Sequence, residues 1–179
     1  MGMDVYGQNP TSEEGKHFRN NAWAWRPLAD YCIEVAPDIT AQCKHWHTND
    51  GDGLDGRNSL LLADALQREI DSGRCKRWGQ IRESELERMP NKPCWLCDAT
   101  GTRKKPPPIP ESGDLDAVLA CIAGEAAERG AGDPATGIKC NVCNGEGYIR
   151  PSAIEYPFAV DNVQEFVTFL RRSGGFEIW

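Results

Sequence analysis

The sequence lacks several features that would place the protein in a familiar functional class. No apolar run approaches the length of a membrane-spanning helix. Residues 1–6 have neither a basic region nor an apolar stretch, so we expect no signal peptide, and Tyr6 stands where myristoylation requires Ser or Thr. No Gly-x-Ser-x-Gly, P-loop or dinucleotide-binding pattern is present. These absences favour a binding protein over an enzyme.

The chain also has fewer basic residues than acidic ones. The chain has 20 Lys and Arg against 27 Asp and Glu, a formal net charge of -7 and a pI near 5.0. Binding a long nucleic acid requires clustered basic side chains that neutralise phosphates. We therefore expect no polymeric DNA or RNA partner. A small charged ligand remains compatible, because one or two arginines can hold a phosphate or carboxylate.

Cysteine, by contrast, is plentiful and regularly spaced. Four of the eight cysteines form two Cys-x-x-Cys pairs, Cys94 with Cys97 and Cys140 with Cys143. The two-residue spacer lets both thiolates of a pair reach one metal ion, and two pairs complete a tetrahedral site. We predict one structural Zn²⁺ held by these four residues, with no open position for a substrate. A secreted disulfide scaffold is the alternative, but the paired spacing favours zinc and a reducing cytoplasm.

Each cysteine pair is followed by a glycine-bearing turn. The segment Cys140-Asn-Val-Cys143-Asn-Gly-Glu-Gly147 resembles one Cys-x-x-Cys-x-Gly-x-Gly unit of the DnaJ cysteine-rich domain. The first pair keeps Gly101 but has Ala99 in place of a glycine. A DnaJ domain has four units and two zinc ions, so two units imply one zinc. The His-Pro-Asp motif of a J-domain is missing, and the resemblance implies a zinc knuckle without implying a chaperone.

Hydrophobic periodicity predicts several helices. We expect helices over residues 20–32 with a break near Pro27, and over 39–46, 59–73, 81–89, 115–129 and 161–173. Asn58 or Ser59 would cap the third of these helices and Asp161 the last. Phe176, Ile178 and Trp179 predict a short apolar strand or clasp at the end.

These elements predict an α+β, helix-rich single domain with a four-cysteine insertion. Residues 1–92 would form its aromatic-rich helical part. Residues 93–150 would form the zinc-knuckle insertion with a Pro-rich connector, and residues 151–179 the C-terminal helix and tail that complete the core.

The segment 18–31 mixes aromatic residues with Arg and Asn. One interpretation is hydrophobic core with surface salt bridges. The other is a recognition surface, since indole rings stack on ligand rings and Arg binds phosphate or carboxylate. On the second interpretation the ligand site comprises Arg19, Asn20, Trp23, Trp25 and Arg26, joined by His45, His47 and Asp52.

The segment 43–55 places His45 and His47 just before a run of acidic residues. The pattern departs from the His-x-His-x-Asp-His signature of metallo-β-lactamases at Asn49, and the chain has only three His. An EF-hand alignment fails because Ser59 stands where calcium needs a bidentate Glu. A polar turn before the next helix, ligand contact and metal binding by Cys43, His45 and His47 stay open as alternatives.

Taken together, several segments resemble a family of small uncharacterised proteins of bacteria and bacteriophages. The similarity lies in residues 3–7, 18–21, 50–54 and 165–178 and in the two knuckles. It brings no settled activity, but it implies an accessory role such as interference with host machinery or host defence signalling. The expected compartment is the cytoplasm, which would be the host's if a bacteriophage encodes the protein.

We therefore hypothesise a zinc-stabilised, non-enzymatic binding protein. Its partner would be a small nucleotide-like ligand, sequestered and not transformed, or a host protein. The alternatives are a protein–protein adaptor that uses the knuckles and a small hydrolase. A homo-oligomer is compatible with all of these functions. We expect no membrane partner under any of them.

Overall fold

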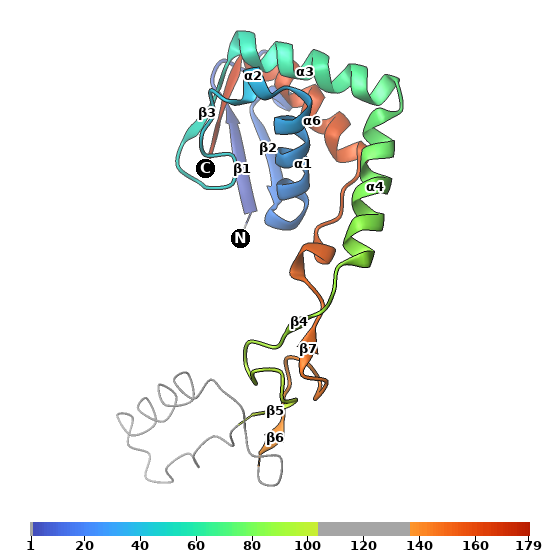
Figure 1. Ribbon diagram of the computed structural model, residues 1–179. Helices are drawn as coiled ribbons and strands as arrows, with labels where there is room; N and C mark the ends of the chain where they lie inside the picture. The colour runs from blue at the N-terminus through green and yellow to red at the C-terminus, as the bar shows by residue number, and fades with distance from the viewer. Residues whose placement is uncertain (1, 104–136) are drawn as a thin grey trace, which may run out of the picture. The chain divides into compact units, whose positions relative to one another are not determined.

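The computed structural model describes residues 2–103 and 137–179, which fall into two compact units (Figure 1). One unit, called the body here, comprises Met1–Arg88 and Ser152–Trp179. The other, called the knuckle unit, comprises Met89–Pro151. The mixture of helices and antiparallel strands, with the four predicted cysteines clustered, confirms the α+β, helix-rich fold class.

The body contains a four-stranded antiparallel sheet in the order β2-β1-β8-β3. Its strands are β1 (Gly2–Gly7), β2 (His17–Asn21), β3 (Asp52–Asp55) and β8 (Gly175–Ile178). The last strand of the chain thus lies inside the sheet, between the first strand and the third. This position confirms the predicted C-terminal strand and ties both ends of the sequence into one core.

Alternation along β1 and β2 gives the sheet one buried and one exposed face. Met3, Val5 and Phe18 are buried, and the residues between them face solvent or are only partly covered. This period of two is the signature of a half-buried strand. The sequence analysis missed this β1–β2 pair, because two short strands among Asn, Gly and charged residues carry little signal until they pair.

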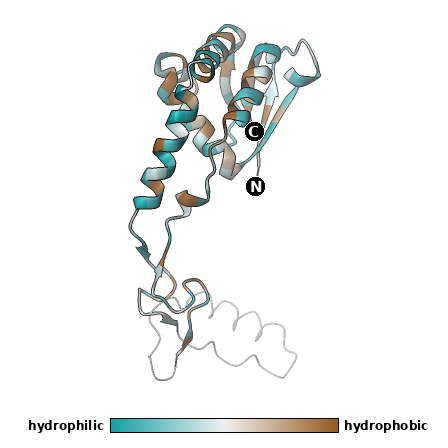
Figure 2. Cartoon of the chain, turned by 90° about the vertical axis from the view of Figure 1, so that its right-hand side faces the viewer, coloured by the Kyte–Doolittle hydropathy of each residue, from teal (hydrophilic) through white to brown (hydrophobic). Residues whose placement is uncertain are grey.

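Helices pack on the buried face of the sheet and, in the case of α4 (Arg74–Arg88), on other helices. They are α1 (Ala22–Val35), α2 (Pro37–Thr40), α3 (Gly56–Asp71), α4 (Arg74–Arg88) and α6 (Val160–Ser173), with short 3-10 turns η1 (Glu13–Gly15) and η2 (Ser152–Glu155). The helices carry both hydrophobic and hydrophilic residues (Figure 2), as expected where one face packs and the other meets water. Phe166 of α6 lies at the centre, with ring contacts to Phe18, Trp25, Phe169 and Phe176.

Several predicted helix boundaries were wrong. Helix α1 is not broken at Pro27 but runs through it, and the Pro27 ring is buried within the helix. The helix predicted over 39–46 reduces to α2, and Trp46 lies in the turns that follow it.

Helix caps also differ from the expectation. The Asp55 side chain accepts the amide of Asn58 at 2.8 Å and caps α3, in place of Asn58 or Ser59. Helix α6 starts one residue before Asp161 and has no side-chain cap. Its C-terminus is as expected, because Gly174 adopts a left-handed conformation with φ of 62°. The predicted helix over 115–129 and most of the Pro-rich connector lie outside the described residues.

The knuckle unit is built from two short antiparallel ladders. Strand β4 (Lys92–Pro93) pairs with β7 (Tyr148–Ile149), and β5 (Thr102–Arg103) pairs with β6 (Ile138–Lys139). Each ladder leads directly into one cysteine pair. The ladders therefore bring together two segments that are separated by more than thirty residues of sequence.

Within residues 2–103 and 137–179, no helix has both the length and the apolar character needed to cross a bilayer.

Candidate metal centre and ligand cavities

The four predicted cysteines meet in the knuckle unit. Cys94, Cys97, Cys140 and Cys143 are all buried, and their sulfur atoms lie within 4.8 Å of one another. The Sγ atoms of Cys94 and Cys140 are 3.8 Å apart, and those of Cys97 and Cys143 are 3.7 Å apart. Sulfurs at about 2.3 Å from a tetrahedral metal would be about 3.8 Å from each other. The donor set and spacing therefore fit a four-coordinate metal ion.

The backbone around this cluster has an approximate internal two-fold symmetry. The amide of Cys94 donates to the carbonyl of Gly147 at 2.8 Å, and the amide of Cys140 donates to that of Gly101 at 2.9 Å. Both glycines have positive φ, 77° at Gly101 and 80° at Gly147. A Cβ on Gly101 would lie 2.3 Å from the Gly145 carbonyl oxygen, and one on Gly147 would lie 2.2 Å from that of Ala99. Both positions therefore require glycine.

The symmetry is broken at Ala99. Its counterpart in the second knuckle is Gly145, and both residues lie in the left-handed region, with φ of 65° and 80°. A left-handed conformation costs a residue with a Cβ roughly 1–2 kcal/mol. The first knuckle therefore holds strain that the second does not.

Two thiols of the cluster, Cys97 and Cys143, have displaced pKa values. Burial raises the pKa of Cys97 to about 11, although the Gly101 amide acts in the opposite direction. For Cys143, burial again opposes ionisation. The Gly147 amide, which donates to the sulfur at 3.2 Å, and neighbouring donors outweigh it and lower the pKa to about 7. A thiolate is therefore accessible at neutral pH, as metal ligation requires.

The body contains a cavity of about 260 Å³ between the start of β1, the first turns of α1 and the loop 47–49. Met3, Ala22 and Trp25 supply its apolar walls, and Arg26 and His47 supply polar ones. Arg26 takes part in none of the ion pairs among the described residues. Its guanidinium is therefore available to an anion in this cavity.

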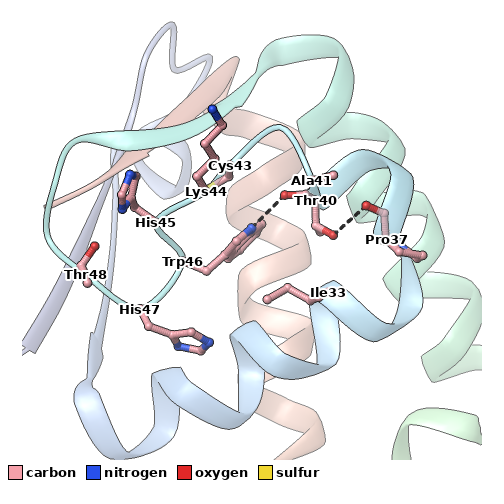
Figure 3. Close-up of a pocket in the computed structure, with 10 residues that line it drawn as sticks. All are labelled: Ile33, Pro37, Thr40, Ala41, Cys43, Lys44, His45, Trp46, His47 and Thr48. Atoms are coloured by element: carbon pink, nitrogen blue, oxygen red, sulfur yellow. Dashed lines mark hydrogen bonds between the residues drawn. The ribbon is translucent and has the colours of Figure 1, made fainter.

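A second cavity of about 330 Å³ lies on the other side of His47 and Thr48. Ile33 of α1 and Trp46 face each other across it, with His47 beside α1 (Figure 3). Trp46 is fixed in place because its ring nitrogen donates to the Thr40 carbonyl at 3.1 Å. The loop that carries His47 thus forms a wall shared by the two cavities.

His47 itself is oriented by helix α1. Its Nε2 lies 3.1 Å from Oδ1 of Asp30. A carboxylate that holds an imidazole fixes the orientation of the ring. His47 therefore presents an oriented ring to the cavity, where it can hydrogen-bond to a ligand.

Arg26 extends the site towards an aromatic pair, Trp23 and Tyr156, of which Trp23 is exposed and Tyr156 is half-buried. The guanidinium lies 5.7 Å from the ring centre of Tyr156, and the ring of Tyr156 lies 4.8 Å from that of Trp23. Trp23 is 45% exposed, whereas Trp25 is fully buried and donates to the Trp46 carbonyl at 2.6 Å. Of the two tryptophans predicted to stack on a ligand, only Trp23 is open to solvent, and Trp25 can contribute only as a cavity wall.

Other residues of the predicted ligand site lie elsewhere. Neighbours along β2 point to opposite faces of the sheet. Arg19 is consequently on the outer face, 3.7 Å from Asp4, while Asn20 is buried and donates to Asn162 at 2.8 Å. Neither lines the two cavities.

The remaining candidates belong to the loop before β3. Asp52 accepts the backbone amides of Lys44 and His45, so it stabilises that turn, as the polar-turn interpretation expected. His45 lines the second cavity. Among the described residues, a metal-binding cluster of three or more ligands is found only at the four cysteines, and Cys43, His45 and His47 do not form one.

Two contributors to the site were missed from the sequence. Asp30 lies four residues after Arg26 on the same helix, and this spacing places both side chains on one face. The spacing could therefore have identified Asp30 as a site residue from the sequence. Tyr156 comes from a segment about 130 residues away along the chain. No sequence pattern links it to α1.

Comparison of the chain with protein-family models, with curated proteins and with solved structures finds no match in any of the three.

Proposed function

We propose that the protein is a zinc-stabilised binding protein whose body captures a small anionic molecule that carries an aromatic ring. The observation that carries the proposal is Arg26, which lines a partly open, mainly apolar cavity without a carboxylate partner among the described residues. An arginine in such a place binds a phosphate or carboxylate through charge-assisted hydrogen bonds.

The size and walls of the cavity support a compact ligand. A volume of about 260 Å³ accommodates one ring system with an attached anionic group. Apolar walls from Met3 and Trp25 suit the ring, and Arg26 with His47 suits the anion. A nucleotide-like signal has this chemistry. The resemblance to bacterial and bacteriophage proteins makes sequestration of such a signal, and so interference with host defence, the proposed biological role.

Zinc is the metal that the proposal assigns to the four cysteines. An all-thiolate, four-coordinate donor set is typical of structural zinc. The ion would close the knuckle unit and leave no position for a substrate. The proposed ligand chemistry therefore belongs to the body and the proposed metal to the knuckle unit.

A hydrolase is the second candidate, and the contact between His47 and Asp30 favours it. A carboxylate-oriented histidine beside a cavity is the arrangement of a general base. The two candidates differ in the fate of the ligand. A bound molecule that is recovered intact supports sequestration, and one that is recovered cleaved supports hydrolysis.

The experiment is a native mass spectrometry screen of the zinc-loaded protein against nucleotides and nucleotide-derived signals. Hits are recovered after denaturation and identified. Arg26→Gln should weaken a genuine hit about ten-fold or more, because a charged hydrogen bond contributes roughly 1.5–3 kcal/mol. Arg19→Gln, an arginine on the outer face of the sheet, is the matched control and should bind as the unmodified protein does. Equal binding by the Arg26 variant would remove the cavity as the site.

A further inference from the structure

The two units of the protein carry different balances of charge. The body has nineteen acidic side chains and thirteen basic ones. Around the knuckles, residues 92–103 and 138–150 reverse this balance: Lys92, Arg103, Lys139 and Arg150 stand against Asp98 and Glu146. The other six acidic residues of the knuckle unit and its other three basic ones belong to 104–136, outside the described residues. The net charge of the chain therefore conceals a basic region.

These four basic side chains lie on or beside the two ladders. Lys92 belongs to β4, and Arg150 follows β7 directly. Arg103 belongs to β5 and Lys139 to β6. None of the four joins an ion pair with a described residue. A zinc tetrathiolate would carry a formal charge of about −2, but its sulfurs are buried, whereas Lys92, Lys139 and Arg150 are exposed.

Two large aromatic side chains lie beside the first ladder. Tyr148, in β7 opposite Pro93, is 49% exposed, and Trp95, two residues after Pro93, is 54% exposed. The symmetry-related positions of the other knuckle hold Thr102 and Asn141, which are not aromatic. Both aromatic residues thus belong to the short segments that also carry Lys92 and Arg150.

We propose that the knuckle unit binds a short stretch of single-stranded nucleic acid. Bases would stack on Trp95 and Tyr148, and Lys92 and Arg150 would contact the phosphates beside them. Sequence-tolerant binding of single strands uses this combination of aromatic faces and unpaired basic groups. A duplex offers no free base faces, so it would bind more weakly. This site is separate from the cavity of the proposed function and does not depend on it.

The composition of the surface favours a nucleic acid over a protein partner. Lysine is depleted at the core of protein–protein interfaces, where apolar side chains gather. Here Lys92 and Arg150 flank the exposed aromatic side chains along the chain. The inference also revises the expectation drawn from the net charge, because binding depends on local clustering of charge.

The test uses the full-length, zinc-loaded protein and fluorescein-labelled twelve-nucleotide dT and U single strands, with a duplex of equal length for comparison. Fluorescence anisotropy at several salt concentrations gives both affinity and salt dependence. We expect saturable single-strand binding, and Trp95→Ala should weaken it about ten-fold. Trp179→Ala, a similarly exposed tryptophan of the body, is the matched control and should leave Kd unchanged. Zinc content is measured for each variant, so that loss of the fold is not mistaken for loss of contact.

A second variant tests the phosphate contacts. Lys92→Gln with Arg150→Gln should flatten the slope of log affinity against log salt by about 1.4, since each phosphate contact on a single strand contributes about 0.7. Lack of saturable binding at low salt would overturn the proposal. Tighter binding of the duplex would overturn it too, as would an unchanged Kd in a zinc-loaded Trp95→Ala protein. Either result would favour a protein as the partner of this surface.

Discussion

The body and the knuckle unit are stabilised in different ways. In the body, one continuous cluster of buried side chains, with Phe166 at its centre, joins the sheet to the helices. In the described part of the knuckle unit the buried cluster consists of the four cysteines, with Leu96 and Ile149 packed against it. Burial of apolar surface can hold the first unit together. The described part of the second buries less of it, and the proposed metal ion would stabilise it instead.

The comparison also separates the two proposed binding modes. The body offers partly open cavities whose walls include residues of its hydrophobic core such as Trp25 and Trp46, which suits a compact ligand. The knuckle unit offers exposed rings and charges on short ladders, which suits an extended partner. Variants in one unit should therefore leave the properties of the other unchanged, and each prediction below tests that separation.

The largest expected effect is loss of the proposed zinc ion. The unmodified protein should hold one zinc per chain, and Cys94→Ser should lose it. Binding of a structural zinc supplies on the order of 10 kcal/mol in small zinc modules, so the knuckle unit should unfold. Hydrogen exchange should become fast at the amides of Cys94 and Cys140, which are now bonded across the cluster, and stay slow in α6.

The control for the zinc variant is Cys75→Ser, a buried cysteine of the body. That variant should retain zinc and lose stability only in the body. A fully zinc-loaded Cys94→Ser protein with unchanged exchange would contradict the assignment of the metal site.

The next largest effect should come from the core of the body. Phe166→Ala removes a fully buried ring that contacts four other aromatic rings. Such a truncation lowers the free energy of unfolding by about 3–5 kcal/mol. Denaturant unfolding followed by tryptophan fluorescence should show the loss, and elemental analysis should still find one zinc. If zinc were lost as well, the two units would not be independent.

A smaller effect is expected at the strained position of the first knuckle. Ala99→Gly relieves a left-handed alanine, and part of the gain is offset by the greater freedom of glycine in the unfolded chain. We expect the knuckle unit to gain about 0.5–1 kcal/mol, measured as slower zinc release to a chelator. Gly145→Ala, at the symmetry-related position, should accelerate release. Equal release rates in all three proteins would mean that the backbone strain at this position does not affect zinc release from the knuckle unit.

The smallest effect concerns an exposed ion pair of the body. Hydrogen bonds from Arg74 hold the pKa of Glu69 below its usual value. A depressed carboxyl pKa stabilises the fold above the unfolded pKa of about 4.3, and this contribution disappears as pH falls through the lower, folded value. Arg74→Gln should therefore reduce Tm slightly at pH 6–7. Because Arg74 is exposed, the change should be small.

The difference between the Arg74→Gln and unmodified proteins should shrink towards zero in acid, below the folded pKa of Glu69. A difference that grew on acidification would show that Arg74 acts through something other than this carboxylate.

Part of the fold could be read from local sequence patterns. The spacing of Val163, Phe166, Val167 and Leu170 predicted α6, and all four side chains are buried. The stripe that predicted α3 was also correct, with Leu62 and Leu66 fully buried.

The helix boundaries were less predictable. A Pro within a helical pattern usually ends the helix, but here the packing of α1 on the core outweighs the lost hydrogen bond at Pro27.

The candidate ligand site was predictable only in part. Arg26 and His47 were both expected to contact a ligand, and both line the same cavity. The sequence could not distinguish Trp23 from Trp25, since both lie in one short aromatic run. Their two positions on α1 differ by about 200° around the helix axis, so one faces the core and the other solvent.

The sequence by itself determined the cysteine cluster, because the two-residue spacer and the following glycines set the geometry of each half within a few residues. It also determined the helices whose apolar stripes are long enough to show a period. Only the tertiary structure decided which strands pair, that the last strand enters the sheet between the first and third, and that α1 and the loop 47–49 border one cavity. These features depend on contacts between residues far apart in sequence. Such contacts form because the whole chain minimises exposed apolar surface, and no single segment records that outcome.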